Sequence, residues 1–372
     1  MNKIALVISG VFLLGVLFLL FLLSSSPKQE QTQPQKKENA PKTQVIATNL
    51  DTPWGLAFLP NGELLVTERQ GNVKRIDQNG NVATVATLSK VQEIGEGGLL
   101  GIALHPDFSK NNFVYFYYTY SAAGNDTLNR VVRLTYKNNQ LSNEQIIVDA
   151  IPGASNHNGG RIKFGPDKNL YITTGDAQNP SLSQDKNSLA GKILRVTDEG
   201  KPVPGNPFNN LVYSYGHRNP QGIAWDSKGR MWEVEHGQSA TDELNSIEMG
   251  KNYGWPEIQG DEEKVGMVKP RVHSGANTTW APSGAAIVND KLYFAGLRGQ
   301  SLYQVSLNSD RIYKMEQPLE VKSLLQGEFG RLRDVVLGPD NMLYITTSNR
   351  DGRGSPAEDD DKIIKVNPKL LQ

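Results

Sequence analysis

The stretch SNHNGGRIKFGPDKNLYITTGDA, residues 155–177, decides the fold. Two short apolar segments flank the sequence GPDKN (165–169) in its middle. Because Gly, Pro, Asp and Asn favour tight turns, this pattern predicts a β-hairpin. In an antiparallel hairpin, the residues before the first strand and after the second strand lie at the same end. The stretch therefore predicts that His157 and Asp176 lie close together.

His157 and Asp176 form a candidate catalytic pair. A carboxylate beside an imidazole fixes the tautomer of the ring and stabilises its protonated form, which a general base requires. The alternative is a turn aspartate and a surface histidine that do not meet. The hairpin by itself leaves both interpretations open.

The same hairpin recurs along most of the chain. Its six copies span residues 55–68, 101–119, 161–176, 222–237, 284–296 and 332–349. Further short strands follow four of the copies, at residues 73–77, 192–196, 301–305 and 362–366. Repeats of four short strands, with almost no helical periodicity, are typical of a β-propeller. We therefore predict an all-β fold, a six-bladed β-propeller of four-stranded antiparallel blades, over residues 45–372.

Closure of this ring needs one more strand. We expect residues 45–50 to complete the last blade, because an open ring would expose strand edges. A pair of β-sandwiches is the alternative architecture, but it does not predict six similar hairpins.

The N-terminal residues indicate export. Residues 4–23 are almost wholly apolar, and about 20 such residues cross a bilayer as one helix. We predict that residues 1–23 form a hydrophobic helix, either a signal anchor or a cleaved signal peptide. Residues 24–44, rich in Ser, Gln, Lys and Pro, predict a flexible linker. The propeller is therefore expected outside the cytoplasm, membrane-anchored or secreted.

The composition excludes several classes of protein. The 39 basic and 39 acidic residues balance, whereas a nucleic-acid-binding domain shows a basic excess. The chain has no cysteine, which excludes disulfides, thiolate metal ligands and a cysteine nucleophile. The sequence does not decide between a monomer and a homodimer.

The hairpin geometry applies to all six repeats, so polar residues at equivalent strand ends should gather at one face of the ring. These residues are Glu96, His157, Asp176, Arg218, Asn219, Gly237, Gln238, Arg298, Arg331 and Arg333. Arginines in excess of carboxylates indicate an anionic ligand, because the guanidinium fork matches carboxylate oxygens. The alternative for each arginine is a solvated side chain or a clamp on backbone carbonyls of the next blade.

The chain resembles a known family through motifs that run in order over nearly all of residues 45–366. The motifs include LDTPWGLAFLPNGELLVTER (50–69), GEGGLLGIALHPDF (95–108), HNGGRIKFGPD (157–167), YGHRNPQGIAWD (215–226), NYGWP (252–256), WAPSG (280–284) and RLRDVVLGPD (331–340). In these motifs it is similar to the soluble quinoprotein sugar dehydrogenases of the glucose/sorbosone and aldose sugar dehydrogenase type, which use pyrroloquinoline quinone (PQQ) and calcium. The resemblance implies PQQ-dependent oxidation of aldoses to lactones at the anomeric carbon, with electrons passed to an artificial or respiratory acceptor.

The resemblance also implies roles for the proposed catalytic residues. It makes His157 the general base that takes the proton of the sugar hydroxyl, and Asp176 the residue that orients His157. It places Arg218 over the reactive carbonyl of PQQ, with Asn219 beside it.

Independently of the resemblance, no protein side chain accepts a hydride, so such an oxidation requires a cofactor. Since no Gly-rich NAD fingerprint is present, a quinone is the consistent acceptor.

Further residues are expected to bind the cofactor and the metal. The resemblance implies that backbone carbonyls of Gly237 and Gln238 coordinate calcium, and that Arg331 and Arg333 hold PQQ carboxylates. Arg298 takes a place that is usually lysine. Glu96 stands where glutamine is frequent and is expected to contact substrate or its waters.

Two departures and two alternatives qualify the resemblance. Gln238 stands where proline is common, which a backbone ligand tolerates, and short loops favour broad aldose activity over strict glucose specificity. Trp280, in the motif WAPSG, is the candidate for stacking on a planar cofactor.

The first alternative to a sugar dehydrogenase is a non-catalytic propeller that binds a glycan or protein partner. The second is a calcium-dependent hydrolase of the lactonase type, which would need more side-chain carboxylates around the metal.

Overall fold

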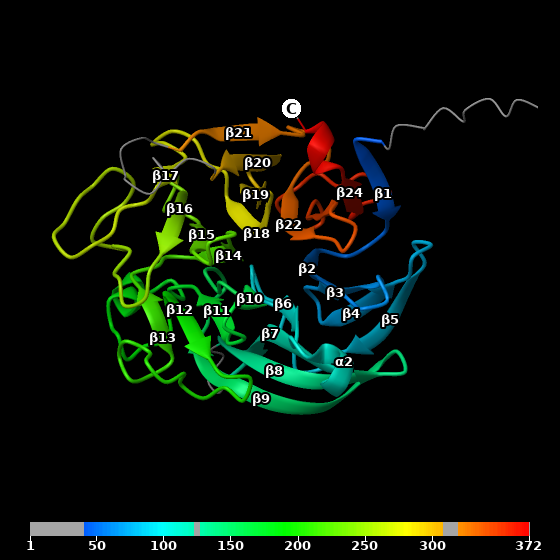
Figure 1. Cartoon of the computed structure of the whole chain (residues 1–372), viewed down its shortest axis with the longest axis horizontal. Helices are drawn as coiled ribbons and strands as arrows, with labels where there is room; N and C mark the ends of the chain where they lie inside the picture. The colour runs from blue at the N-terminus through cyan, green and yellow to red at the C-terminus, as the bar shows by residue number, and fades with distance from the viewer. Residues whose placement is uncertain (1–40, 123–126, 308–318, 372) are drawn as a thin grey trace, which may run out of the picture. The chain divides into compact units, whose positions relative to one another are not determined.

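The computed structural model describes residues 41–122, 127–307 and 319–371. In these ranges, six four-stranded antiparallel sheets form a ring around a central axis (Figure 1). This arrangement confirms the predicted six-bladed propeller. The predicted hydrophobic helix of residues 1–23 lies outside the described residues. Within the described ranges, no helix has the length and apolar character needed to cross a membrane.

The first three blades each run from the axis outwards in chain order. Blade 1 comprises β2 (Pro53–Phe58), β3 (Leu64–Glu68), β4 (Asn72–Ile76) and β5 (Val82–Thr87). Blade 2 comprises β6 (Leu99–Leu104), β7 (Phe113–Ser121), β8 (Thr127–Lys137) and β9 (Gln140–Pro152), with the short helix α2 (Phe108–Asn111) in its first turn. Blade 3 comprises β10 (Ile162–Phe164), β11 (Leu170–Thr174), β12 (Lys192–Val196) and β13 (Val212–Tyr215), with the 3₁₀ turn η2 (Pro180–Ser183) after β11.

The remaining blades follow the same plan, except that the last one borrows its outer strand. Blade 4 comprises β14 (Pro220–Trp225), β15 (Met231–Glu235), β16 (Glu243–Ile247) and β17 (Val272–His273). Blade 5 comprises β18 (Pro282–Val288), β19 (Lys291–Gly296), β20 (Ser301–Ser306) and β21 (Val321–Leu324). Blade 6 comprises β22 (Leu332–Leu337), β23 (Leu343–Thr347), β24 (Ile363–Val366) and β1 (Thr43–Ala47), and the 3₁₀ turn η4 (Pro368–Leu370) follows β24.

The strand β1 closes the ring. It pairs antiparallel with β24, so that Val45 lies opposite Ile364, and Figure 1 shows this blue strand beside the red C-terminal one. The expectation that this segment completes the last blade is confirmed. Because β1 begins at Thr43, the predicted linker 24–44 extends slightly too far, and residues 43–44 belong to the propeller.

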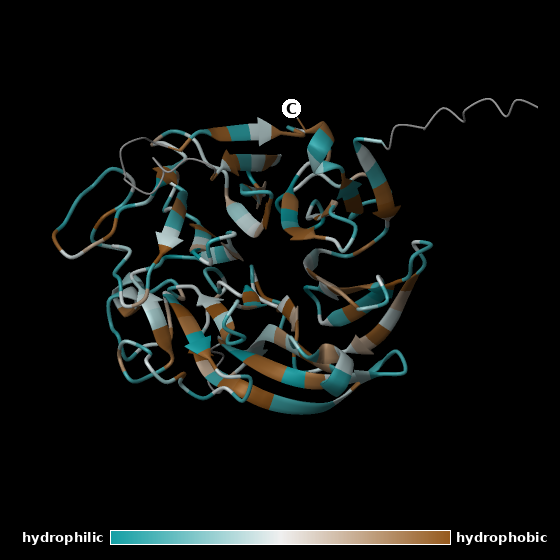
Figure 2. Ribbon diagram, in the orientation of Figure 1, coloured by the Kyte–Doolittle hydropathy of each residue, from teal (hydrophilic) through white to brown (hydrophobic). Residues whose placement is uncertain are grey.

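Close packing of the inner strands explains the glycines that recur in them. A Cβ atom on Gly222 of β14 would lie 2.1 Å from the carbonyl oxygen of Ser283, and one on Gly284 of β18 would lie 1.9 Å from Asp334 Oδ1. No side chain fits at such distances, so glycine lets neighbouring blades approach closely at the axis. Apolar residues fill the space between the blades, and Figure 2 shows apolar and polar segments alternating along the strands.

Candidate functional site

The inner strands all begin at the same face of the ring, and a cavity of about 480 Å³ opens there. All but two of the predicted site residues line this cavity: Glu96, His157, Arg218, Gly237, Gln238, Arg298, Arg331 and Arg333. The other two, Asp176 and Asn219, are fully buried and hydrogen-bond to the loops that carry the cavity residues. The expectation that these residues gather at one face is therefore confirmed.

His157 and Asp176 meet at the two ends of the β10–β11 hairpin. His157 Nδ1 lies 2.8 Å from Asp176 Oδ1, with the carboxylate fully buried and the histidine side chain 19% exposed. Because an ionised carboxylate only accepts hydrogen bonds, Nδ1 carries the proton in the neutral ring and Nε2 is left unprotonated. The pair therefore presents an imidazole that is ready to accept a proton.

The surroundings of this pair fix its geometry. Asp176 also accepts hydrogen bonds from Trp255 Nε1 (2.9 Å) and from the Gln178 backbone N–H (2.8 Å). His157 itself has a left-handed backbone conformation (φ 60°), which is uncommon for a non-glycine residue and recurs at functional sites. Its N–H donates to a carboxylate oxygen of Glu96 (3.2 Å), so the loop is held from the cavity side as well.

Arg218 projects into the cavity from the loop before β14. Its backbone N–H donates to Glu235 Oε2 (2.6 Å), its Nη1 donates to the His236 carbonyl (3.3 Å), and its guanidinium lies 5.2 Å from the Trp255 ring centre. The next residue, Asn219, accepts a hydrogen bond from the Gly159 N–H (3.0 Å). This bond joins the Arg218 loop directly to the His157 loop.

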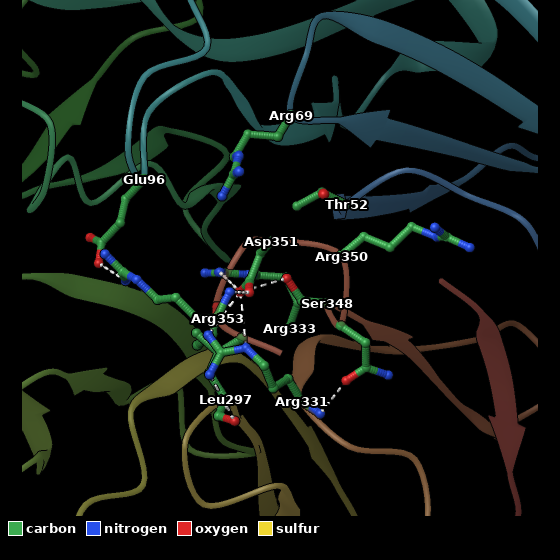
Figure 3. A network of polar contacts seen from close by, with 12 residues as sticks. Thr52, Arg69, Glu96, Leu297, Arg331, Arg333, Ser348, Arg350, Asp351 and Arg353 are labelled. Carbon is green, nitrogen blue, oxygen red and sulfur yellow. Dashed lines mark hydrogen bonds and ion pairs between the residues drawn. The ribbon is translucent and has the colours of Figure 1, made fainter. Parts of the chain in front are cut away.

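Asp351 organises a pair of arginines that line the cavity (Figure 3). Arg331 donates to Asp351 Oδ2 from Nε (3.0 Å) and Nη2 (2.8 Å), and Ser348 donates to the same oxygen (3.1 Å). Arg333 forms an ion pair with it at 3.6 Å. One carboxylate thus holds two buried guanidinium groups, which leaves an excess positive charge at this wall.

Arg353 also lines the cavity, and its side chain reaches to Glu96 (Figure 3). Its Nη1 donates to Glu96 Oε1 (2.5 Å) and its Nη2 donates to Asn156 Oδ1 (2.9 Å). Since Glu96 precedes blade 2 and Asn156 precedes blade 3, this side chain of blade 6 ties three blades together. The guanidinium is about half exposed, so it also faces solvent.

Burial and neighbouring charges shift two pKa values in the cavity strongly. Burial lowers the pKa of Arg333 to about 9, an effect that Asp351 opposes and the neighbouring Arg331 and Arg69 reinforce. Burial would raise the pKa of Glu96, but His236, Arg353 and the His157 N–H outweigh it and bring that pKa to about 2. Glu96 is therefore ionised throughout the neutral range.

The loop after β15 lines the cavity with Gly237 and Gln238. Asp242 accepts a hydrogen bond from the Gly237 N–H (3.0 Å) and bonds from Thr279 Oγ1, the Trp280 N–H and the Ala281 N–H. Among the hydrogen bonds of the described residues, none is accepted by the carbonyl oxygen of Gly237 or Gln238. Carbonyl oxygens of this kind are suitable calcium ligands.

Several cavity donors lack a partner. The Nε atoms of Arg218 and Arg333 are buried and make no hydrogen bond within the described part of the chain. Unpaired buried donors cost free energy, which an acceptor-rich ligand would recover. With five arginines against two carboxylates, those of Glu96 and Asp242, among its lining residues, the cavity suits a compact anion with several oxygen atoms.

Sequence reasoning missed Arg353, Asp351 and Gln221. The first two follow β23, just as Asp176 follows β11, so the rule that identified the histidine–aspartate pair would also have identified them. Trp280 does not line the cavity, contrary to expectation. Its ring packs against Phe294 and Tyr303 in the core of blade 5 (centroids 5.3 and 5.7 Å apart).

The sequence and the fold are similar to those of known proteins. A family model described as Glucose / Sorbosone dehydrogenase matches residues 50–361. The chain belongs to this family. Aldose sugar dehydrogenase YliI of Escherichia coli is 31% identical to it, covering 88% of this chain and 92% of that protein. Quinoprotein glucose dehydrogenase B of Acinetobacter calcoaceticus is 32% identical, covering 65% of this chain and 58% of that protein.

A solved structure extends the comparison. The PQQ-bound form of aldose sugar dehydrogenase from Streptomyces coelicolor is 42% identical and superposes with a TM-score of 0.81, covering 87% of this chain and 97% of that chain. The resemblance inferred from the sequence motifs is therefore confirmed at the level of the family.

The low pKa of Glu96 predicts how stability depends on pH. A carboxyl group whose pKa is lower in the folded than in the unfolded chain stabilises the fold above its unfolded value, here 4.5, and loses that contribution as pH falls towards 2. Glu96→Gln should lower the free energy of unfolding by about 1–3 kcal/mol at pH 7 and by less at pH 3. Chemical denaturation at both values measures this.

Glu93→Gln is the matched control, because Glu93 pairs with Arg69 but is 40% exposed. It should change the free energy of unfolding by less than about 1 kcal/mol at pH 7. An equal effect of Glu96→Gln at pH 7 and pH 3 would contradict the assignment.

Proposed function

We propose that the chain oxidises aldose sugars at the anomeric carbon, using PQQ and calcium. The observation that carries this proposal is the His157–Asp176 pair at the wall of an arginine-rich cavity in a member of the glucose/sorbosone dehydrogenase family. Relatives named as an aldose sugar dehydrogenase and a quinoprotein glucose dehydrogenase support the same reaction class.

His157 acts as the general base. Its Nε2 is unprotonated because Nδ1–H faces Asp176, so it can take the proton of the anomeric hydroxyl as the carbon loses a hydride. Asp176 holds the ring in this tautomer and stabilises the imidazolium that forms. Trp255, which donates to the same carboxylate, keeps it in position.

The arginines fit the proposed cofactor. Arg331 and Arg333 would hold its carboxylates, since their guanidinium groups outnumber the single Asp351 carboxylate between them. Arg218, with an unpartnered Nε, would donate to a quinone oxygen. PQQ, when bound, supplies the electrophilic carbonyl that accepts the hydride, a capability that side chains lack.

Calcium fits beside the arginines. The free carbonyl oxygens of Gly237 and Gln238 would supply protein ligands to the ion, and Asp242 fixes the loop that carries them. Arg218 and a bound cation together would stabilise negative charge at one point of the cavity.

Glu96 and Arg353 border the same cavity and would contact the sugar or its waters. A half-exposed guanidinium and an ionised carboxylate can both bond to hydroxyl groups. The short loops of the chain favour broad aldose activity over strict glucose specificity. We further propose that residues 4–23 anchor or export the chain, on the strength of their apolar sequence, and that electrons leave through an extracytoplasmic acceptor.

Reconstitution tests the proposal. The apoprotein, supplied with PQQ and Ca²⁺, should reduce an artificial electron-acceptor dye with glucose, xylose or galactose. Omission of PQQ should abolish the reaction, and removal of Ca²⁺ with a chelator should reduce it strongly. Absence of PQQ binding at micromolar concentrations would contradict the proposal and would favour a non-catalytic binding module.

His157→Ala should lower turnover by about 10²–10⁴-fold, because general-base help of this kind contributes that much. PQQ affinity should remain near that of the unchanged protein, since the arginines rather than His157 carry the anion contacts. Steady-state kinetics and PQQ titration measure the two effects separately.

His273→Ala is the control, because His273 is similarly exposed (20%) and pairs with Asp261 away from the cavity. It should turn over at the unchanged rate. Full turnover in His157→Ala would remove this residue from the role of base.

A further inference from the structure

A second cavity, of about 560 Å³, opens where the inner strands end, at the opposite face from the His157 cavity. Each of the six repeats places one large apolar residue at the same position near the end of its inner strand. These residues are Phe58, Leu104, Phe164, Trp225, Ile287 and Leu337. Five are partly buried and Leu337 is 39% exposed, so the cavity has an apolar rim that reaches solvent. Its volume lies within the range of about 300–1,000 Å³ that small-molecule sites occupy.

Lys163 brings a single amine into this apolar space. Its Nζ reaches from β10 to the carbonyl oxygens of Ile223 (3.4 Å) and Ala285 (3.3 Å), on the inner strands of blades 4 and 5. Both hydrogen bonds are long, and no carboxylate of the described residues lies within ion-pair distance of the amine. The ammonium group therefore has only two weak hydrogen bonds and no counter-ion among the described residues.

The nearest carboxylate, that of Asp334, already has other hydrogen-bond and ion-pair partners. Asp334 Oδ2 accepts hydrogen bonds from the Leu56 N–H (3.0 Å) and pairs with Arg161 Nη1 (3.0 Å), while Oδ1 accepts from the Val335 N–H (3.0 Å). Arg161, Lys163 and Asp334 thus leave one positive charge unmatched at the inner end of the cavity. A buried cation without a partner is costly, and an anion beside it would recover that cost.

A polar layer separates this cavity from the first one. Gln221 accepts a hydrogen bond from Arg333 Nη1 (2.9 Å) at its side chain and one from Arg161 Nε (2.9 Å) at its backbone carbonyl. Ser283 donates to the same side-chain oxygen (3.1 Å). A ligand in the second cavity would therefore not touch His157, and the two sites can be tested independently.

We propose that this second cavity binds a small amphipathic carboxylate, with its carboxylate on Lys163 and its apolar body against the six-residue rim. One negative charge matches the one unpaired ammonium group. A neutral apolar molecule would leave the ammonium unsatisfied, and a phosphate would bring excess charge into an apolar site.

The titration of Lys163 supports this geometry. Burial lowers its pKa to about 8, with Asp334 opposing the shift and Arg161 adding to it. The amine is thus mostly charged at pH 7 and loses its charge as pH rises above 8, while a fatty carboxylate stays ionised. Arg161 and Asp334 are the other charged groups that face the amine.

Equilibrium dialysis of the full-length protein with radiolabelled decanoate tests the proposal. The unchanged protein should bind one saturable equivalent at pH 7, and Lys163→Met should weaken binding by at least about 10-fold, since a charge-assisted hydrogen bond is lost. Lys163→Arg, which keeps the charge, should retain most of the affinity. Decanol, with the same tail and no charge, should not displace the label.

Two further measurements distinguish loss of the binding site from misfolding of the variant. Lys163→Met should oxidise sugars at the unchanged rate, because Lys163 does not line the His157 cavity. In the unchanged protein, decanoate affinity should fall by about 10-fold or more between pH 7 and pH 10. Equal binding by the unchanged protein and Lys163→Met, or affinity that is constant across this pH range, would overturn the proposal.

Discussion

The site depends on one constraint, the antiparallel pairing of each inner strand with the strand that follows it. In every blade this pairing sends the residues before the first strand and after the second to the same face. Ring closure by β1 then brings six such strand ends around one axis. Residues as distant in sequence as Glu96 and Arg353 become hydrogen-bonded neighbours for this reason.

Electrostatics gives the two ends of the axis different chemistry. At one end, arginines outnumber carboxylates and face a histidine whose tautomer is fixed by Asp176. At the other, a single amine projects into an apolar space. Gln221 and the arginines bonded to it lie between the two, so one ring supports an anion-binding, proton-accepting cavity and a separate amphipathic one.

The fold and much of the site were predictable because they follow from a local pattern repeated six times. The hairpin around GPDKN predicts that His157 and Asp176 meet. Its copies predict that the arginines gather at the same face of the ring. Asp351 and Arg353 were missed although the same rule covers the residues after β23. Trp280 was wrongly expected at the cavity, because a loop sequence does not reveal which way a ring packs. The reach of Lys163 across the axis depends on distances between non-adjacent blades, which no local pattern encodes.

The most direct test of the central claim is a crystal structure of the chain with PQQ and Ca²⁺. The account predicts PQQ in the cavity between His157 and the Arg331–Arg333 wall, with its carboxylates on those guanidinium groups and calcium on the carbonyl oxygens of Gly237 and Gln238. PQQ bound elsewhere on the ring, or an empty cavity at saturating PQQ, would contradict it.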